Sequence, residues 1–141
     1  MNKKKSNSAV KYDSVHALVA DAGKPQLPRR ICTGYKLVSI GRGGRKYSLW
    51  MDGVARVHYV PGKPSTPHKD AGPLAVYTSK WTAQTALSNL CAYARTSQLW
   101  ECTYVPSRVR DRMFSREYGL QIVNTGDTAM AARVTLVRRI E

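Results

Sequence analysis

Clustered basic side chains are the residues of this sequence whose type and spacing best support a specific chemistry. They occur in the N-terminal segment, in a glycine-rich stretch near position 43, and in an arginine-dense stretch after position 107. Guanidinium and ammonium groups bind phosphate oxygens through charge-assisted hydrogen bonds. We therefore expect contacts with the phosphate backbone of a nucleic acid, made by Lys3, Lys4, Lys5, Arg29, Arg30, Arg42, Arg45, Lys46, Arg108, Arg110, Arg112 and Arg116.

The glycine-rich stretch 41–46 reads GRGGRK. It lacks the Gly-Lys-Ser/Thr ending of a P-loop, and strand-like sequence follows it, so a P-loop or dinucleotide-binding turn is not predicted. Arg-Gly-Gly runs are typical of segments that bind single strands. Two interpretations stay open, a basic hairpin tip that contacts a polyanion and a solvated turn.

The positive charge extends along the whole chain. The sequence has 23 Lys and Arg against nine Asp and Glu, a net charge of +14. Residues 1–30 hold seven bases and two acids, residues 31–78 seven and two, and residues 79–141 nine and five. Such a chain is attracted to polyanions. The expected partner is DNA or RNA, and an acidic protein is the alternative.

Residues for catalysis or metal binding are few. Glu101 lies inside a predicted strand, where burial would let it act as a base; the alternative is an outward-facing glutamate that pairs with a nearby arginine. The three histidines are scattered, and the three cysteines form no Cys-x-x-Cys pair, so Cys91 and Cys102 are expected to be buried thiols. We expect no metal, no cofactor and, Glu101 aside, no catalytic residue.

The sequence also lacks signals for a membrane or for export. No apolar run approaches the roughly 20 residues of a transmembrane helix, and the N-terminal residues lack the apolar core of a secretory signal. We expect no membrane contact and a cytoplasmic location, in the host cell if the protein is viral.

The elements that would position the basic groups follow from residue patterns. Residues 1–31 are expected to form a flexible basic arm with a short nascent helix, and residues 32–141 a single domain. Apolar residues at helical spacing follow a capping serine, Ser79, and predict one main helix over about 79–95. Strand-like segments, bounded by turn residues, are 34–40, 47–51, 54–60, 74–77, 99–105 and 130–136, with 120–124 as a further short candidate.

These elements predict an α+β fold, a mostly antiparallel sheet of about six strands with the helix packed on one face. Residues 61–73 should form an irregular loop, and residues 108–117 a loop or a short helix. In the last strand, alternate residues from Met130 to Leu136 are apolar, as in a strand with one buried face. The alternation breaks after Leu136, so Arg138 and Arg139 are expected to project beyond the edge of the sheet.

Aromatic residues are numerous, and several adjoin a base in the sequence. In a small α+β domain we expect most of these rings in the core and two or three on a binding face, where they would stack on bases. The rings are Tyr35, Tyr47, Trp50, Tyr59, Tyr77, Trp81, Trp100 and Tyr104.

The order of these segments resembles that of small accessory proteins of tailed bacteriophages and related mobile elements. The resemblance rests on GPLAVYTS at 72–79 followed by a helix, LWECTY at 99–104 and ARVTLV at 132–137. It covers roughly residues 33–140 and implies a structural likeness without an assigned activity. A looser likeness is to the sheet cores of ADP-ribosyltransferase-like proteins, in which the counterparts of functional residues would be Tyr35, Ser48, Tyr59 and Glu101.

Three hypotheses follow. The first is a non-enzymatic, basic accessory protein of phage type that contacts nucleic acid backbones. The second is an inhibitor or assembly factor that binds an acidic host or phage protein. The third is a divergent ADP-ribosyltransferase-like enzyme that uses Glu101.

Overall fold

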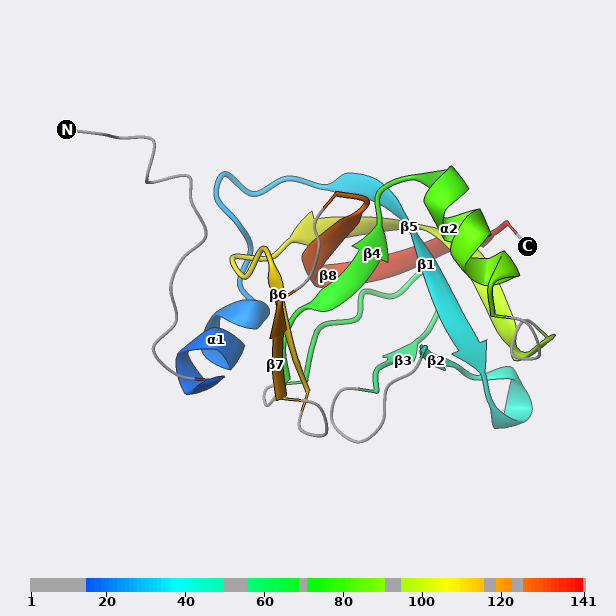
Figure 1. The fold of residues 1–141 in the computed structure, drawn as a ribbon, viewed down its shortest axis with the longest axis horizontal. Helices are drawn as coiled ribbons and strands as arrows, with labels where there is room; N and C mark the ends of the chain where they lie inside the picture. The colour runs from blue at the N-terminus through cyan, green and yellow to red at the C-terminus, as the bar shows by residue number, and fades with distance from the viewer. Residues whose placement is uncertain are drawn as a thin grey trace.

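Six antiparallel strands form the main sheet, and four of them close into a barrel (Figure 1). The computed structural model describes residues 15–49, 56–68, 71–90, 95–115, 119–122 and 126–140. The elements in chain order are α1 (Val15–Ala22), β1 (Cys32–Ile40), the 3₁₀ turn η2 (Arg42–Gly44), β2 (Lys46–Ser48), β3 (His58–Tyr59), β4 (Leu74–Tyr77), α2 (Lys80–Ser88), β5 (Ser97–Pro106), β6 (Arg112–Ser115), β7 (Gly119–Ile122) and β8 (Thr128–Arg139).

The barrel is the ring β1-β4-β8-β5, in which β5 returns to pair with β1. The β1–β5 ladder closes the barrel and runs from Cys32↔Tyr104 to Ser39↔Ser97. The other edge of β1 pairs with β4 only at Tyr35↔Tyr77 and then, from Val38 onward, with β2. The edge of β1 at Lys36 and Leu37 therefore lies between two ladders, where the barrel wall is open.

The barrel interior is the larger core of the described residues. Alternate strand residues point inward and form one buried cluster, which includes Val38, Tyr59, Val76, Cys102 and Leu136. This two-residue alternation is the pattern that predicted the strands. The α+β fold class and the antiparallel sheet of six strands are thereby confirmed.

The main helix is confirmed on one face of the sheet. The Ser79 side chain accepts a hydrogen bond from the Thr82 amide at 3.3 Å, as its capping role predicted. Ala83 is fully buried against Leu37 and Leu99 on the outer face of the barrel. The helix ends at Ser88, earlier than predicted, although Leu90 beyond it still packs on the same cluster. Residues 91–94 of the predicted helix, with Cys91, lie outside the described residues.

The last strand corrects one expectation. Arg138 and Arg139 do not project beyond the sheet, because they pair with Glu101 and Trp100 on β5. The register shifts between Glu101 and Cys102, so that Val137 has no partner on β5. A β-bulge inserts one extra residue and reverses the alternation after it. The interruption of the apolar alternation after Leu136 therefore marks a bulge in the ladder between β8 and β5, and the strand continues beyond it.

Residues 112–115 are a second correction, since they form a strand and not a loop or helix. They pair with β7 in a separate two-stranded sheet, with Phe114 opposite Leu120. The local sequence is dense in arginine and has no clear period, so the strand depends on the backbone hydrogen bonds of this hairpin.

The second half of the N-terminal segment packs against the barrel. Leu18 and Ala22 of α1 are buried against Val109. The Ser107 hydroxyl, itself buried, donates to the Ala22 carbonyl at 2.8 Å and accepts from the Val109 amide at 3.0 Å. A helix of this length is marginal by itself in water. Docking on the chain beyond β5 stabilises it here.

Candidate functional site

The loop between β1 and β2 is a closed, hydrogen-bonded turn. The Gly41 amide donates to the Arg45 carbonyl at 2.7 Å, and the Gly44 amide donates to the Gly41 carbonyl at 3.1 Å. Gly43 and Gly44 have φ of 71° and 77°, a region that residues with a Cβ rarely adopt. The glycines thus allow a tight turn that leaves the Arg42 and Arg45 side chains exposed.

Beside this turn, β2 and β3 bring two rings and a further arginine together. Tyr47 pairs with His58 across the strands, with ring centroids 5.2 Å apart and planes at 32°. The guanidinium carbon of Arg56 lies 3.8 Å from the Tyr47 ring centroid. A Cβ on Gly41 would lie 3.0 Å from Tyr47 Cε2, so the ring also packs against the loop. We call Arg42, Arg45, Tyr47, Arg56 and His58 the Tyr47 patch.

The arginines of the Tyr47 patch form no ion pair within the described part of the chain. The ion pairs in the described part of the chain join Asp21 to Lys24 and Arg108, and Glu101 to Arg138. None of these involves the arginines of the patch, and all three of those arginines are exposed. The patch therefore presents positive charge and aromatic surface together.

Lys46 faces the other side of β2 and is less accessible. Its ammonium lies 3.3 Å from the Gly44 carbonyl, to which it donates, and 5.5 Å from the centroid of the Trp100 ring. Trp100 in turn donates from Nε1 to the Gln98 side chain at 2.9 Å. Lys46 is half-buried, and its hydrogen bond to the Gly44 carbonyl stabilises the turn on the barrel side.

The other predicted bases lie at the opposite end of the barrel. Arg30 and Arg110 line one shallow cleft there, formed where residues 24–26 pair with the end of β5. Arg108 approaches Asp21 at 4.0 Å. Seven steps of the β1–β5 ladder, at about 3.3 Å each, separate this end from the Tyr47 patch by roughly 23 Å. The bases at the two ends of the described barrel therefore form two separate surfaces.

The remaining predicted bases are placed as follows. Arg29 is exposed and Arg112 half-buried. Lys3, Lys4, Lys5 and Arg116 lie outside the described residues.

Glu101 is held in an ion pair. Its Oε1 accepts hydrogen bonds from Arg138 Nη2 at 2.8 Å and Nε at 2.9 Å, and its side chain is 26% exposed. The structure thus matches the alternative interpretation, a strand glutamate that pairs with a nearby arginine. Tyr35 lies opposite Glu101 across the ladder and packs on the helix side of the sheet.

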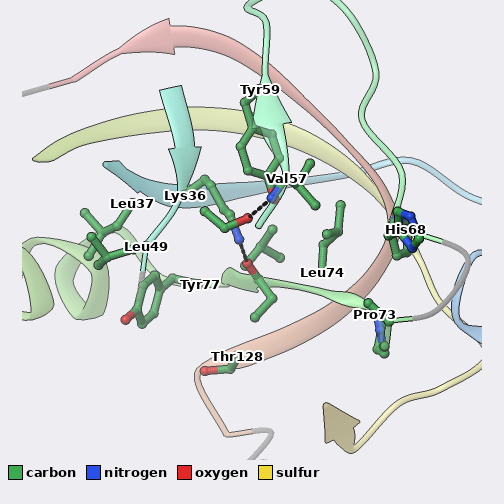
Figure 2. A pocket seen from close by; sticks show the side chains of 16 residues that line it. Lys36, Leu37, Leu49, Val57, Tyr59, His68, Pro73, Leu74, Tyr77 and Thr128 are labelled. Carbon is green, nitrogen blue, oxygen red and sulfur yellow. Dashed lines mark hydrogen bonds between the residues drawn. The ribbon is translucent and has the colours of Figure 1, made fainter. Parts of the chain in front are cut away.

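Ser48 and Tyr59, the other two residues of the looser likeness, line a cavity of about 170 Å³ at the open part of the barrel wall (Figure 2). Glu101 is not among its lining residues. Between β1 and β4, the Lys36 ammonium donates a hydrogen bond to the Ala75 carbonyl, and it lies 5.4 Å from the centroid of the Tyr59 ring. The loop 61–73 supplies one wall, with Pro67, His68 and Pro73.

Two groups of residues escaped the sequence analysis. Arg56 and the Tyr47–His58 ring pair were not grouped with the GRGGRK loop, because strand pairing brings them there. Lys36 was not singled out, although it occupies an inward-facing position between Gly34 and Val38. A cation at a core position of a strand was the signal that could have identified it.

The predicted aromatic residues divide between the core and the surface. Tyr59 and Tyr104 are buried, Tyr47 and Trp100 half-buried, and Trp81 is 73% exposed on α2. Trp50 lies outside the described residues.

Cys102 is expected to resist alkylation in the folded protein. It is fully buried in the barrel, and burial raises the pKa of its thiol to about 11. At pH 8 only about one molecule in a thousand would carry the reactive thiolate. Mass spectrometry after iodoacetamide treatment at pH 8 should find Cys102 unmodified in native protein and modified in urea. Rapid labelling of native Cys102 would contradict its placement in the core.

The described residues also bear on metal binding and on membrane-spanning helices. Within the described residues, no group of three or more His, Cys, Asp or Glu side chains is arranged to hold a metal ion. In the same part of the chain, no helix combines the length and the apolar character needed to cross a bilayer. No protein-family model, curated protein or solved structure matches the chain.

Proposed function

We propose that this protein is a non-enzymatic, basic accessory protein that binds nucleic acid through phosphate contacts, with the Tyr47 patch as its main contact surface. The proposed location is the cytoplasm, that of the host cell if the protein belongs to a bacteriophage. One observation carries the proposal: an exposed arginine stacked on a ring pair and two exposed arginines on the adjoining turn have no carboxylate partner among the described residues.

The electrostatics of the patch favour a polyanion over a single acidic side chain. Arg56 lies over the Tyr47 ring, and Arg42 and Arg45 are exposed on the turn that packs against the same ring through Gly41. A phosphate backbone supplies several negative charges at regular spacing, and binding releases its condensed counterions. Guanidinium groups also bind phosphate oxygens in a bidentate geometry.

The ring pair adds a contact that a purely electrostatic surface lacks. Tyr47 and His58 present aromatic area beside the arginines, and a base of a single strand stacks on such rings with little dependence on sequence. Arg30 and Arg110, at the other end of the barrel, provide a second basic surface for a longer strand.

We expect the triple variant Arg42→Gln, Arg45→Gln, Arg56→Gln to bind nucleic acid more weakly and with less dependence on salt. Each lost phosphate contact lowers the slope of log K against log salt by about 0.7 for single strands and about 0.9 for duplex DNA. The slope should therefore become shallower by about 2 for single strands and about 3 for duplexes. Fluorescence anisotropy with mixed-sequence oligonucleotides, from about 50 to about 200 mM salt, measures both quantities.

A charge-matched control separates the patch from overall charge. The variant Lys63→Gln, Lys80→Gln, Arg133→Gln removes three exposed cations from other segments, and we expect it to retain most of the affinity. Equal losses in the two variants would show that net charge alone attracts the nucleic acid. Wild-type affinity that is absent, or that does not fall with salt, would refute the proposed function.

A further inference from the structure

The cavity in the barrel wall holds a buried cation, Lys36, that forms no ion pair with the described residues. Lys36 is 8% exposed, and its ammonium has three N–H donors. One donor binds the Ala75 carbonyl, and the Tyr59 ring lies beside the group. None of the ion pairs among the described residues includes Lys36. Buried charges in proteins are ordinarily paired, because their desolvation is costly.

A second polar group in the same cavity is also unsatisfied. Tyr59 is 1% exposed, and its hydroxyl is the buried side-chain polar atom of the described residues that has no hydrogen-bond partner. By contrast, Ser48, which also lines the cavity, accepts a hydrogen bond from the Val57 amide at 2.9 Å (Figure 2). A buried polar group left unpaired is rare in folded proteins.

Most of the remaining lining is apolar, although His68 and Thr128 also contribute to it, and the cavity volume limits the size of a ligand. Leu37, Leu49, Leu74, Val76 and Pro73 contribute to the walls. The volume of about 170 Å³ is close to that of engineered protein cavities that bind benzene. Pockets that bind small molecules commonly combine apolar walls with a few polar groups that orient the ligand.

We propose that this cavity binds a small monocarboxylate whose apolar part is about the size of a benzene ring. The carboxylate accepts hydrogen bonds from the Lys36 ammonium, and the Tyr59 hydroxyl donates a further one. The apolar part lies against the leucine and proline side chains. Pro67, His68 and Pro73 of the Pro-rich loop form one wall of the site. This site is separate from the Tyr47 patch and does not depend on the proposed nucleic acid binding.

The test compares three carboxylates with a neutral analogue. Benzoate, cyclohexanecarboxylate, hexanoate and benzamide are titrated into the full chain and followed by isothermal calorimetry and by amide NMR shifts. At least one carboxylate should bind with millimolar or tighter affinity, and benzoate should bind about tenfold or more tightly than benzamide, because benzamide lacks the charge. The shifts should include residues of β1, β4 and the loop 61–73.

Variants assign the effect to the two polar groups. Lys36→Met should weaken benzoate binding at least tenfold and leave benzamide binding within about threefold. Tyr59→Phe should weaken benzoate binding by a smaller factor. Lys46→Met is the control, since Lys46 is a second lysine beside an aromatic ring, half-buried and outside the cavity lining, and it should change neither affinity.

Three results would overturn the proposal. They are the absence of binding by all three carboxylates, equal affinities for benzoate and benzamide, and unchanged benzoate affinity in Lys36→Met. If Lys36→Met fails to fold, the wild-type comparison of benzoate with benzamide and the Tyr59→Phe variant still decide the question.

Discussion

Leu136→Ala is expected to lower the free energy of unfolding by about 2–5 kcal/mol. Leu136 is 1% exposed inside the barrel, in one cluster with Tyr59, Cys102 and Val134. Truncation removes its transfer free energy and leaves a cavity that the ladder between β8 and β5 prevents from closing. Equilibrium urea unfolding measures the loss, and a change under about 1 kcal/mol would contradict the interior position of this side chain.

The next residue along the chain supplies the control. Val137 is 52% exposed and lies at the bulge, without a partner on β5. Val137→Ala should therefore change the free energy of unfolding by less than about 1 kcal/mol. A large loss at Val137 with a small one at Leu136 would show that the alternation of β8 continues through this point in the other phase.

Gly34→Ala is expected to lower the free energy of unfolding by about 1–3 kcal/mol, and Gly34→Val by more. A Cβ at this position of β1 would lie 2.9 Å from Tyr104 Cε1 and 3.0 Å from the Tyr77 carbonyl oxygen. The tyrosine ring can shift, but the carbonyl belongs to β4, where Tyr77 pairs with Tyr35. Relief of the clash must therefore weaken the short β1–β4 contact.

Gly23→Ala is the matched control for Gly34. No heavy atom lies within 4 Å of a Cβ built on Gly23. Alanine there reduces the conformational entropy of the unfolded chain, so the variant should be as stable as wild type or more stable by up to about 1 kcal/mol. Thermal and urea unfolding of both glycine variants test the prediction. Equal losses at the two positions would contradict the close packing at Gly34.

Sequence patterns correctly predicted the elements that depend on residues close together in the chain. The cap at Ser79 forms the predicted hydrogen bond, and the apolar spacing after it does pack on the sheet. The two-residue alternation located β8 correctly as far as Leu136. Beyond that residue the same pattern misled, because a bulge depends on the register with β5, and register is a property of two strands.

The candidate binding surfaces likewise depend partly on local sequence and partly on strand pairing. Composition identified the strongly basic character of the chain and the GRGGRK turn. The pairing of β2 with β3 then placed Arg56 and His58 beside that turn, and the length of the β1–β5 ladder kept Arg30 and Arg110 away from it. Distances of this kind follow from topology, which charge counts do not contain.

The fold class, the main helix and the positive charge follow from residue type and from spacing over a few positions, so they could be predicted without coordinates. The places of those charges on the surface depend on tertiary contacts. Lys36 reads as an ordinary strand lysine, yet its ammonium is bound to a carbonyl 39 residues away, in an opening between two ladders. The closure of the barrel buries this cation, and closure depends on which distant strands become neighbours.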